Sequence, residues 1–342
     1  MSLALLQNIW YFVICASVVL YTILDGFDLG VGSLHLFAQT DKDRRIFLNA
    51  IGPVWDGNEV WLVVVGGALF AGFPDAYASI FSGFYNLLMF FLAGIIFRAV
   101  AIEFRSKQKS TSWRKFWDGS FCIASTLIAM GLGVVLGNLI KGVPVNADGN
   151  FSGTFLSFLS PYSVVVGLLA LTLFTMHGNI YLLMKTEGDI HDYIRTFLRK
   201  TVGAFVVMYL AATIMTFIYV PHMIERMLDH KWAFIFPVCT FLSIVNIFRM
   251  VKKGYDGWAF ISSSLSIALL FVLFGIGTYP IILRSTLDTS LNSMTLYNSS
   301  SSRLTLKVLL LIAGMGVPLV LAYGVWIYRI FRGKVHLEET SY

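Results

Sequence analysis

Long apolar stretches alternate with short polar segments along nearly the whole chain. A helix that crosses a bilayer needs about 20 apolar residues, and nine stretches approach or exceed this length. They are continuous and do not alternate between apolar and polar positions, so they predict transmembrane helices and argue against a transmembrane barrel. The nine predicted helices cover residues 8–36, 51–72, 78–102, 118–140, 162–185, 201–221, 231–250, 257–279 and 306–331.

The composition supports this reading. Hydrophobic residues make up 57% of the 342 residues and charged residues only 13%, whereas a soluble domain carries about 25% charged residues. We therefore expect residues 1–342 to form a single all-α polytopic membrane domain. Four helices, a basic loop, four more helices and a last one suggest two four-helix bundles plus a peripheral helix.

The positive charges are distributed unevenly between alternate loops. Nineteen of the 25 lysines and arginines fall on one side, a group that includes Arg98 and Arg105, and six fall on the other. Because basic loops stay in the cytoplasm, this asymmetry predicts an N-terminus outside and a C-terminus in the cytoplasm. It also explains the net charge of +6 as a topology signal, so no nucleic-acid partner is expected.

Several carboxylates fall inside or at the ends of predicted helices. Asp25 and Asp28 lie in LDGFDLGVG, three residues apart and therefore on one helix face. Asp56 and Glu59 repeat this spacing in PVWDGNEVWL at the cytoplasmic start of the second helix, and Glu103 closes the third. A carboxylate at mid-membrane costs about 2.5–3.5 kcal/mol, so these groups should face the protein interior and find partners.

Two interpretations of the carboxylates stay open. Asp56 and Glu59 could simply be the acidic residues that favour the first turn of a helix. Asp25 lies too deep for that explanation, which leaves a proton relay or a hydrogen bond that packs helices. Gly26 and Gly30 beside it would let a neighbouring helix approach closely.

The histidines offer no self-contained haem site. Such a site with two axial histidines needs facing imidazoles at similar depth, and only His177, in TMHGNIYL, lies deep in a predicted helix. His177 is then expected to be a hydrogen-bonded packing residue, and Met176 beside it a packing residue too. Cys15, Cys122 and Cys239 lack the spacing of metal ligands. We expect no metal site and no haem ligand in this chain.

Most tryptophans lie near the ends of predicted helices, where interfacial belts of aromatic residues explain them. Trp55 and Trp61 differ because they flank the acidic pair Asp56 and Glu59. They are candidates for the wall of a buried gas route or of a groove that holds a quinone.

The chain resembles subunit II of the cytochrome bd-type quinol oxidases. The most specific matching segments are LDGFDLGVG (24–32) and GPVWDGNEVWLVVVGGALFAGFP (52–74), because acid-bearing sequences of this kind are rare in membrane helices. Further matches, in order along the chain, are FSGFY (81–85), FRAVAIEFRSK (97–107), WDGSF (117–121), GNLIKGVP (137–144), HGNIYL (177–182) and WAFISSSL (258–265).

The resemblance implies a heterodimer in a bacterial cell membrane. The partner, subunit I, would carry the b-type and d-type haems and the quinol-oxidising loop, and the complex would reduce O₂ to water. This chain would act as scaffold and supply a cytoplasmic proton path, with Asp56 at its mouth, Glu59 adjacent and Asp25 further in. Asp28 and Glu103 would support the path, and Trp61 would lie beside the gas route. A quinone bound to this chain and a small accessory membrane subunit stay open.

Two other readings stay open from the sequence. The cyanide-insensitive variant oxidase has a similar subunit II. A proton-coupled transporter could use the same acids around a midplane site, although such a transporter usually has interrupted helices in corresponding positions of two halves, and we find none.

Overall fold

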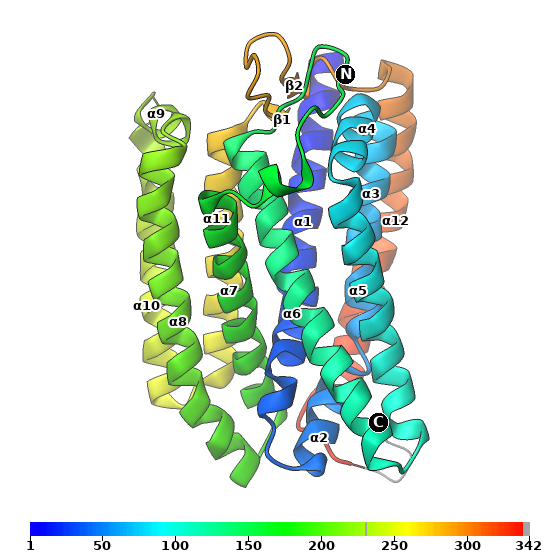
Figure 1. Ribbon diagram of the computed structural model, residues 1–342, viewed down its shortest axis with the longest axis vertical. Helices are drawn as coiled ribbons and strands as arrows, with labels where there is room; N and C mark the ends of the chain where they lie inside the picture. The colour runs from blue at the N-terminus through cyan, green and yellow to red at the C-terminus, as the bar shows by residue number, and fades with distance from the viewer. Residues whose placement is uncertain (230, 338–342) are drawn as a thin grey trace.

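The structure, a computed structural model, describes residues 1–229 and 231–337. Long helices run side by side along the molecule, with a small two-stranded sheet at one end (Figure 1). The α-helices are α1 Leu3–Leu34, α2 Asp41–Ile51, α3 Trp55–Gly72, α4 Pro74–Gly83, α5 Tyr85–Phe104, α6 Thr111–Lys141, α7 Pro161–Lys185, α8 Asp189–Tyr219, α9 His222–Asp229, α10 Ile235–Lys253, α11 Asp256–Thr278 and α12 Arg303–Ile330. Four 3₁₀ turns are η1 His35–Phe37, η2 Arg105–Lys107, η3 Phe155–Phe158 and η4 Lys231–Phe234, and the strands are β1 Ile281–Leu283 and β2 Met294–Thr295.

Eight helices of the described chain are long and apolar enough to cross a membrane. They correspond to eight of the nine predicted segments and confirm an all-α membrane protein. The ninth segment, 51–72, is α3, which has 18 residues and carries Asp56 and Glu59. It packs beside α1 and α12, so its position fits a ninth span although its polar first turns lower its hydropathy.

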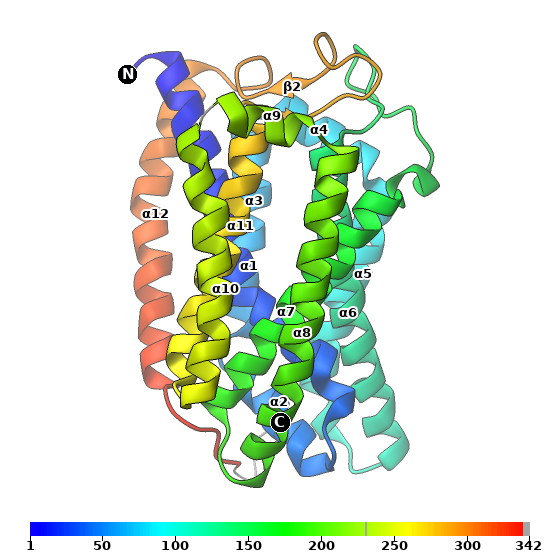
Figure 2. The ribbon, with the colours of Figure 1, turned by 90° about the vertical axis from the view of Figure 1, so that its left-hand side faces the viewer.

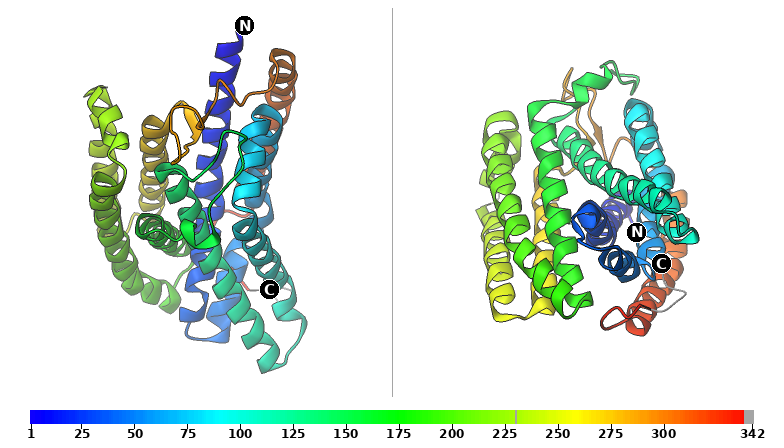
Figure 3. Two further views of the ribbon diagram at one scale, coloured as in Figure 1. Left: turned by 45° about the horizontal axis from the view of Figure 1, so that its top comes forward. Right: turned by 60° about the horizontal axis from the view of Figure 1, so that its bottom comes forward.

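Helix α1 lies in the interior of the molecule (Figure 3) and packs against α3, α6, α7, α11 and α12. On one side α7 packs against α8 and α11, and α10 packs against α11. Helix α12 lies at the edge (Figure 2), and none of its most apolar window is buried within the chain. The contacts run continuously from α1 and α6 to α7, so the division into two four-helix bundles stays a prediction.

The structure differs from the predicted segments mainly where charged residues continue a helix. Helix α8 begins at Asp189, twelve residues before the predicted start, because the amphipathic sequence 189–200 is helical although it is not apolar. Helix α2 was not predicted for the same reason; a capping box of Thr40 and Asp43 starts it. The segment 78–102 is divided at Phe84 into α4 and α5.

Two loops at the sheet end, residues 142–160 and 279–302, are joined to each other. The backbone N–H of Val143 donates to the carbonyl of Arg284 (2.9 Å), and Ser285 Oγ donates to the carbonyl of Val145 (2.7 Å). The second of these loops contains the antiparallel pair β1–β2. The opposite end of the molecule carries α2 (Figure 1).

Glycines allow α1 and α7 to cross at backbone contact, as predicted from Gly30. A Cβ atom added to Gly30 would collide with the backbone carbonyl of Phe174, and one added to Gly178 would lie 2.5 Å from the carbonyl carbon of Gly30. At Gly26 the added atom would meet the ring of Phe174 at 3.1 Å. This crossing fixes the position of α7 along its axis relative to Asp25 and Asp28 of α1.

Candidate functional site

A buried arginine joins two of the predicted carboxylates. Arg98 of α5 donates from Nη2 to Asp25 Oδ1 (2.6 Å) and from Nη1 to Glu59 Oε1 (2.8 Å). The side chains of Arg98 and Asp25 are 0% and 1% exposed, whereas that of Glu59 is 18% exposed. The guanidinium of Arg98 therefore joins α1, α3 and α5 at the place where Glu59 is partly exposed and Asp25 is buried.

Asp28 lies one turn further along α1 and belongs to a second polar chain. Asn58 Nδ2 donates to Asp28 Oδ2 (2.7 Å), and the hydroxyl of Tyr328 donates to Asn58 Oδ1 (2.9 Å). The residue next to Glu59 in α3 thus links Asp28 to α12. The other oxygen of Asp28, Oδ1, has no hydrogen-bond partner in the described part of the chain.

The charges of this site do not balance if every carboxyl is ionised. Asp25, Asp28 and Glu59 would contribute three negative charges against the single positive charge of Arg98. Uncompensated charge in a buried site is costly, so such groups neutralise by holding a proton. The arrangement is therefore suited to accepting and releasing protons.

The exposed fraction of the acids falls from Asp56 through Glu59 to Asp25 and Asp28. Asp56, in the first turn of α3, is exposed on this chain and interacts electrostatically with Glu59 one turn on. Glu59 is partly exposed, Asp25 is buried and Asp28 is fully buried. Glu103 is partly buried in the last turn of α5, five residues after Arg98.

A second buried ion cluster lies towards the α2 end. Asp118 of α6 accepts from Arg105 Nε (2.5 Å) and Arg44 Nη1 (2.9 Å), and its Oδ1 lies 2.6 Å from His35 Nε2. Arg105 also donates to Asp41 Oδ1 (2.6 Å). Asp118 and Arg105 together hold η1, α2, η2 and α6 in place.

The two buried histidines do not fit the axial ligation of a haem. His177 in α7 uses both ring nitrogens, with Nδ1 2.7 Å from Ser263 Oγ and Nε2 3.0 Å from the carbonyl of Ile23. His35 lies twelve residues beyond Ile23, which is about 18 Å along a helix. Its Nε2 is already bound to Asp118. In the described residues, no three His, Cys, Asp or Glu side chains are placed to hold a metal ion.

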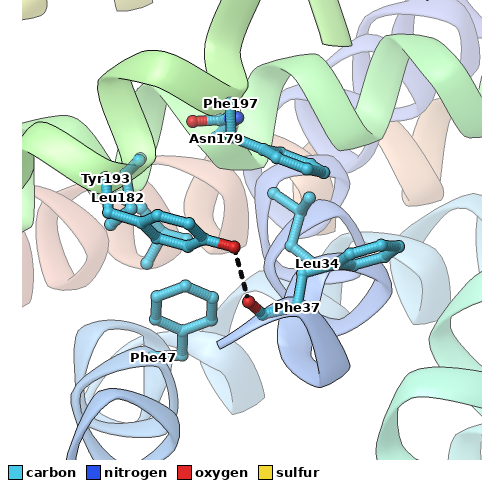
Figure 4. Close-up of a pocket in the computed structure, with 8 residues that line it drawn as sticks. Leu34, Phe37, Phe47, Asn179, Leu182, Tyr193 and Phe197 are labelled. Carbon is cyan, nitrogen blue, oxygen red and sulfur yellow. Dashed lines mark hydrogen bonds between the residues drawn. The ribbon is translucent and has the colours of Figure 1, made fainter. Parts of the chain in front are cut away.

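Trp61 is buried and Trp55 packs against the main core. Residues other than these tryptophans line two pockets of the described chain. One of these lies between η1, α2, α7 and α8 (Figure 4), where the Tyr193 hydroxyl donates to the carbonyl of Phe37 (2.9 Å). The other lies at the sheet end beside Asn86 and Phe155. A gas or quinone route along Trp55 and Trp61 therefore stays a prediction.

Three residues of the two buried ion clusters, Arg98, Asp118 and His35, were not predicted as site residues from the sequence. Arg98 was counted with the loop charges, although it lies inside α5; its apolar surroundings in IIFRAVAI were the signal for a buried cation. Asp118 and His35 were not grouped because 83 residues separate them. Asp118 lies within WDGSF at the start of the apolar run 118–140, and a carboxylate at that position was the available signal.

Comparisons with known proteins agree over nearly the whole chain. The family model of cytochrome bd terminal oxidase subunit II matches residues 6–331. Subunit 2 of the cytochrome bd-I ubiquinol oxidase of Escherichia coli (strain K12) is 33% identical over 377 residues, covering 98% of this chain and 97% of that protein. Subunit 2 of the cytochrome bd ubiquinol oxidase of Bacillus subtilis (strain 168) is 32% identical over 344 residues, covering 99% of this chain and 100% of that protein.

A solved structure shares the fold. A chain of the bd oxidase from Geobacillus thermodenitrificans superimposes with a TM-score of 0.78 at 21% identity, covering 95% of this chain and 98% of that one. The family match, the relatives and the buried acid-bearing helices lead to one conclusion. This chain belongs to the cytochrome bd terminal oxidase subunit II family.

Proposed function

We propose that this chain is the subunit of a bd-type quinol oxidase that ligates no haem, supports the haem-bearing subunit I and conducts protons from the cytoplasm. As a member of its family, the chain is a subunit of a membrane-bound quinol:O₂ oxidoreductase. The observation that carries the finer proposal is the Arg98 site, in which one guanidinium contacts the carboxyls of Asp25 and Glu59 and a third carboxyl, Asp28, lies one turn further along α1.

The proton path follows from the cost of moving charge through lipid. Oxidation of quinol releases protons outside, and reduction of O₂ to water consumes protons from the cytoplasm. Those protons must cross part of the bilayer, where an isolated charge is very unfavourable. In this proposal Asp56 receives a proton at the surface, Glu59 passes it inward, and Asp25 and Asp28 hold it beside Arg98, whose fixed charge stabilises the carboxylate that remains.

The haem chemistry belongs to the partner in this proposal. The haems of subunit I would supply the electrons for O₂ reduction, and this chain's buried histidines are committed to hydrogen bonds with Ser263, Ile23 and Asp118. Scaffolding is the second role, because α3 and α12 expose large apolar side chains such as Val63, Phe70 and Leu319. We assign no quinone site to this chain.

The proposed function is tested by purifying the complex through a tag on this chain and recording its visible absorption spectrum. We expect haem bands in the complex and none in this chain once the partner is removed. A haem d band would also separate a bd-type oxidase from the cyanide-insensitive variant. A tagged chain that purifies without any haem protein would contradict the proposal.

The role of Asp56 is tested by Asp56→Asn. Removal of the titratable group at the mouth should lower quinol-driven O₂ consumption and proton uptake severalfold, with normal haem content, because proton delivery becomes slower. The matched control is Asp75→Asn, since Asp75 also lies in the first turn of a helix, α4, at the other end of α3. Normal turnover and proton uptake in Asp56→Asn would remove Asp56 from the path.

A further inference from the structure

A polar stripe follows one face of α1 from the Arg98 site to the Asp118 cluster. Asp25, Asp28, Gly32 and His35 are separated by three, four and three residues, so they share a face of a helix with 3.6 residues per turn. All four are buried. The ten residues from Asp25 to His35 correspond to a length of about 15 Å.

Arg98, Asp118 and Ser125 contact this stripe, and Arg105 is linked to it through Asp118. Arg98 and Arg105 are seven residues apart on α5 and η2, and contact Asp25 and Asp118 respectively. Asp118 and Ser125 are seven residues apart on α6. Asp118 contacts His35 at one end. Ser125 Oγ lies against Gly32, where any side chain would collide with it.

Buried polar atoms without a protein partner gather along this stripe. The described residues contain eleven such side-chain atoms. Eight of them belong to the stripe, to the four residues just named on α5, η2 and α6, or to residues that contact these or lie next to them in sequence. These atoms are Asp28 Oδ1, His35 Nδ1, Arg44 Nε, Arg98 Nε, Arg105 Nη1, Ser106 Oγ, Trp117 Nε1 and Ser125 Oγ. Buried polar groups in proteins are almost always hydrogen-bonded, and bound water serves those that protein groups do not reach.

From this distribution we infer that a chain of bound water molecules follows the stripe and forms a second route for protons into the Arg98 site. The outer end is the Asp118 cluster, which Asp41 connects to the surface. The chain passes His35 and Ser125 and ends at Asp28 and Asp25. This inference rests on the proposed function, and it adds an entrance separate from Asp56 and Glu59.

His35 is placed to pass protons along this route. Its Nε2 is bound to Asp118 and its Nδ1 is buried without a protein partner. A neutral histidine that accepts a proton on one ring nitrogen and releases one from the other returns to the neutral state. A proton taken from the Asp118 side is thus balanced by one given to the water beside Nδ1. The Ser125 hydroxyl, which can both donate and accept, would continue the relay.

A dry ion cluster that only fastens α1 to α6 is the competing explanation. That role accounts for Asp118, whose two oxygens are both occupied. It does not account for Ser125, which is 0% exposed and donates to no protein group in the described chain. Ser125 therefore separates the two explanations.

The test measures proton uptake from the cytoplasmic side by the two-subunit complex in proteoliposomes, with a pH indicator. Glu59→Gln serves as the background, because it closes the other proposed entrance. We expect His35→Gln or Ser125→Ala, added to this background, to slow the residual uptake about tenfold, within the range for removal of a positioned proton-transfer group. Gln can still donate to Asp118, and Ser125→Ala removes no hydrogen bond to protein.

Ser33→Ala in the same background is the matched control. Ser33 lies beside Gly32 on α1 and donates only to the carbonyl of Leu29 in its own helix (2.9 Å). Uptake and haem spectra should not change in this variant. A structural role for Ser125 or His35 would instead alter the haem spectrum and the rate of haem reduction by quinol together with uptake.

The outcomes separate this inference from the proposed function. Unchanged uptake in both stripe variants, or loss that is accompanied by altered haem spectra, overturns the water route. If His35→Gln does not assemble, Ser125→Ala decides alone. If Glu59→Gln takes up protons at the wild-type rate, the Asp56–Glu59 entrance is wrong, and the same tenfold fall is then expected for the stripe variants in the wild-type background.

Discussion

Replacing Arg98 with methionine should prevent stable assembly of the complex. The variant keeps most of the side-chain volume but removes the guanidinium that contacts Asp25 and Glu59. Breaking a buried ion pair from one side costs about 3–5 kcal/mol, because the remaining charge stays buried without a partner. We expect a large fall in the yield of haem-containing complex and in its thermal unfolding temperature in detergent.

We expect neutral replacements of the two carboxylates that Arg98 contacts to rescue Arg98→Met. Arg98→Met combined with Asp25→Asn and Glu59→Gln removes the charge on both sides, and neutral replacements of a buried ion network are often tolerated. The triple variant should recover most of the yield and unfolding temperature while proton uptake stays low. If Arg98→Met is as stable as the wild type, or if the triple variant is no more stable than the single one, the Arg98 site is not held together by these charges.

Gly30→Ala should destabilise the chain almost as strongly. The added methyl group would occupy the space of the Phe174 carbonyl and approach the backbone nitrogen of Gly178 at 2.9 Å. Backbone atoms cannot rotate away as side chains do, so α1 and α7 must separate along their crossing. Overpacking of a core costs about 1–3 kcal/mol and occasionally more, and we expect the upper end of that range in thermal unfolding of the complex.

Gly131→Ala is the control for this prediction. Gly131 lies within α6, and a Cβ atom added there meets nothing within 4 Å. Alanine is favoured over glycine in a helix by about 1 kcal/mol, so this variant should be as stable as the wild type or slightly more stable. Equal unfolding temperatures for Gly30→Ala and Gly131→Ala would show that the crossing tolerates a wider spacing.

The long apolar helices could be predicted from the sequence because each depends mainly on its own residues. An uninterrupted apolar run of sufficient length is helical in a membrane wherever its neighbours lie. Helix α2 and the first turns of α8 escaped prediction because they are amphipathic and lie at the ends of the spans. Hydropathy does not distinguish such segments from polar loops.

The site could be predicted only in part, for a different physical reason. The spacing of Asp25 and Asp28 and of Asp56 and Glu59 is local, and it was enough to place each pair on one helix face. Their partners are distant in sequence: Arg98 lies 73 residues after Asp25, and Tyr328 lies 270 residues after Asn58. A cation inside an apolar run indicates a buried partner, but only the packing of the helices shows which carboxylate it meets.

The central claim is that this chain conducts protons and leaves the redox chemistry to its partner. The most direct test follows the reaction of the fully reduced complex with O₂, recording haem oxidation and proton uptake in the wild type and in Glu59→Gln. The Gln side chain has the same shape as that of Glu and keeps one oxygen that can accept a hydrogen bond from Arg98. It has no carboxyl group that could take up and release a proton. We predict that the electron-transfer steps that need no proton keep their rate, and that uptake from the cytoplasmic side slows about tenfold. Proton uptake at the wild-type rate both in Glu59→Gln and in Glu59→Gln combined with Ser125→Ala, with normal haem spectra, would contradict the claim.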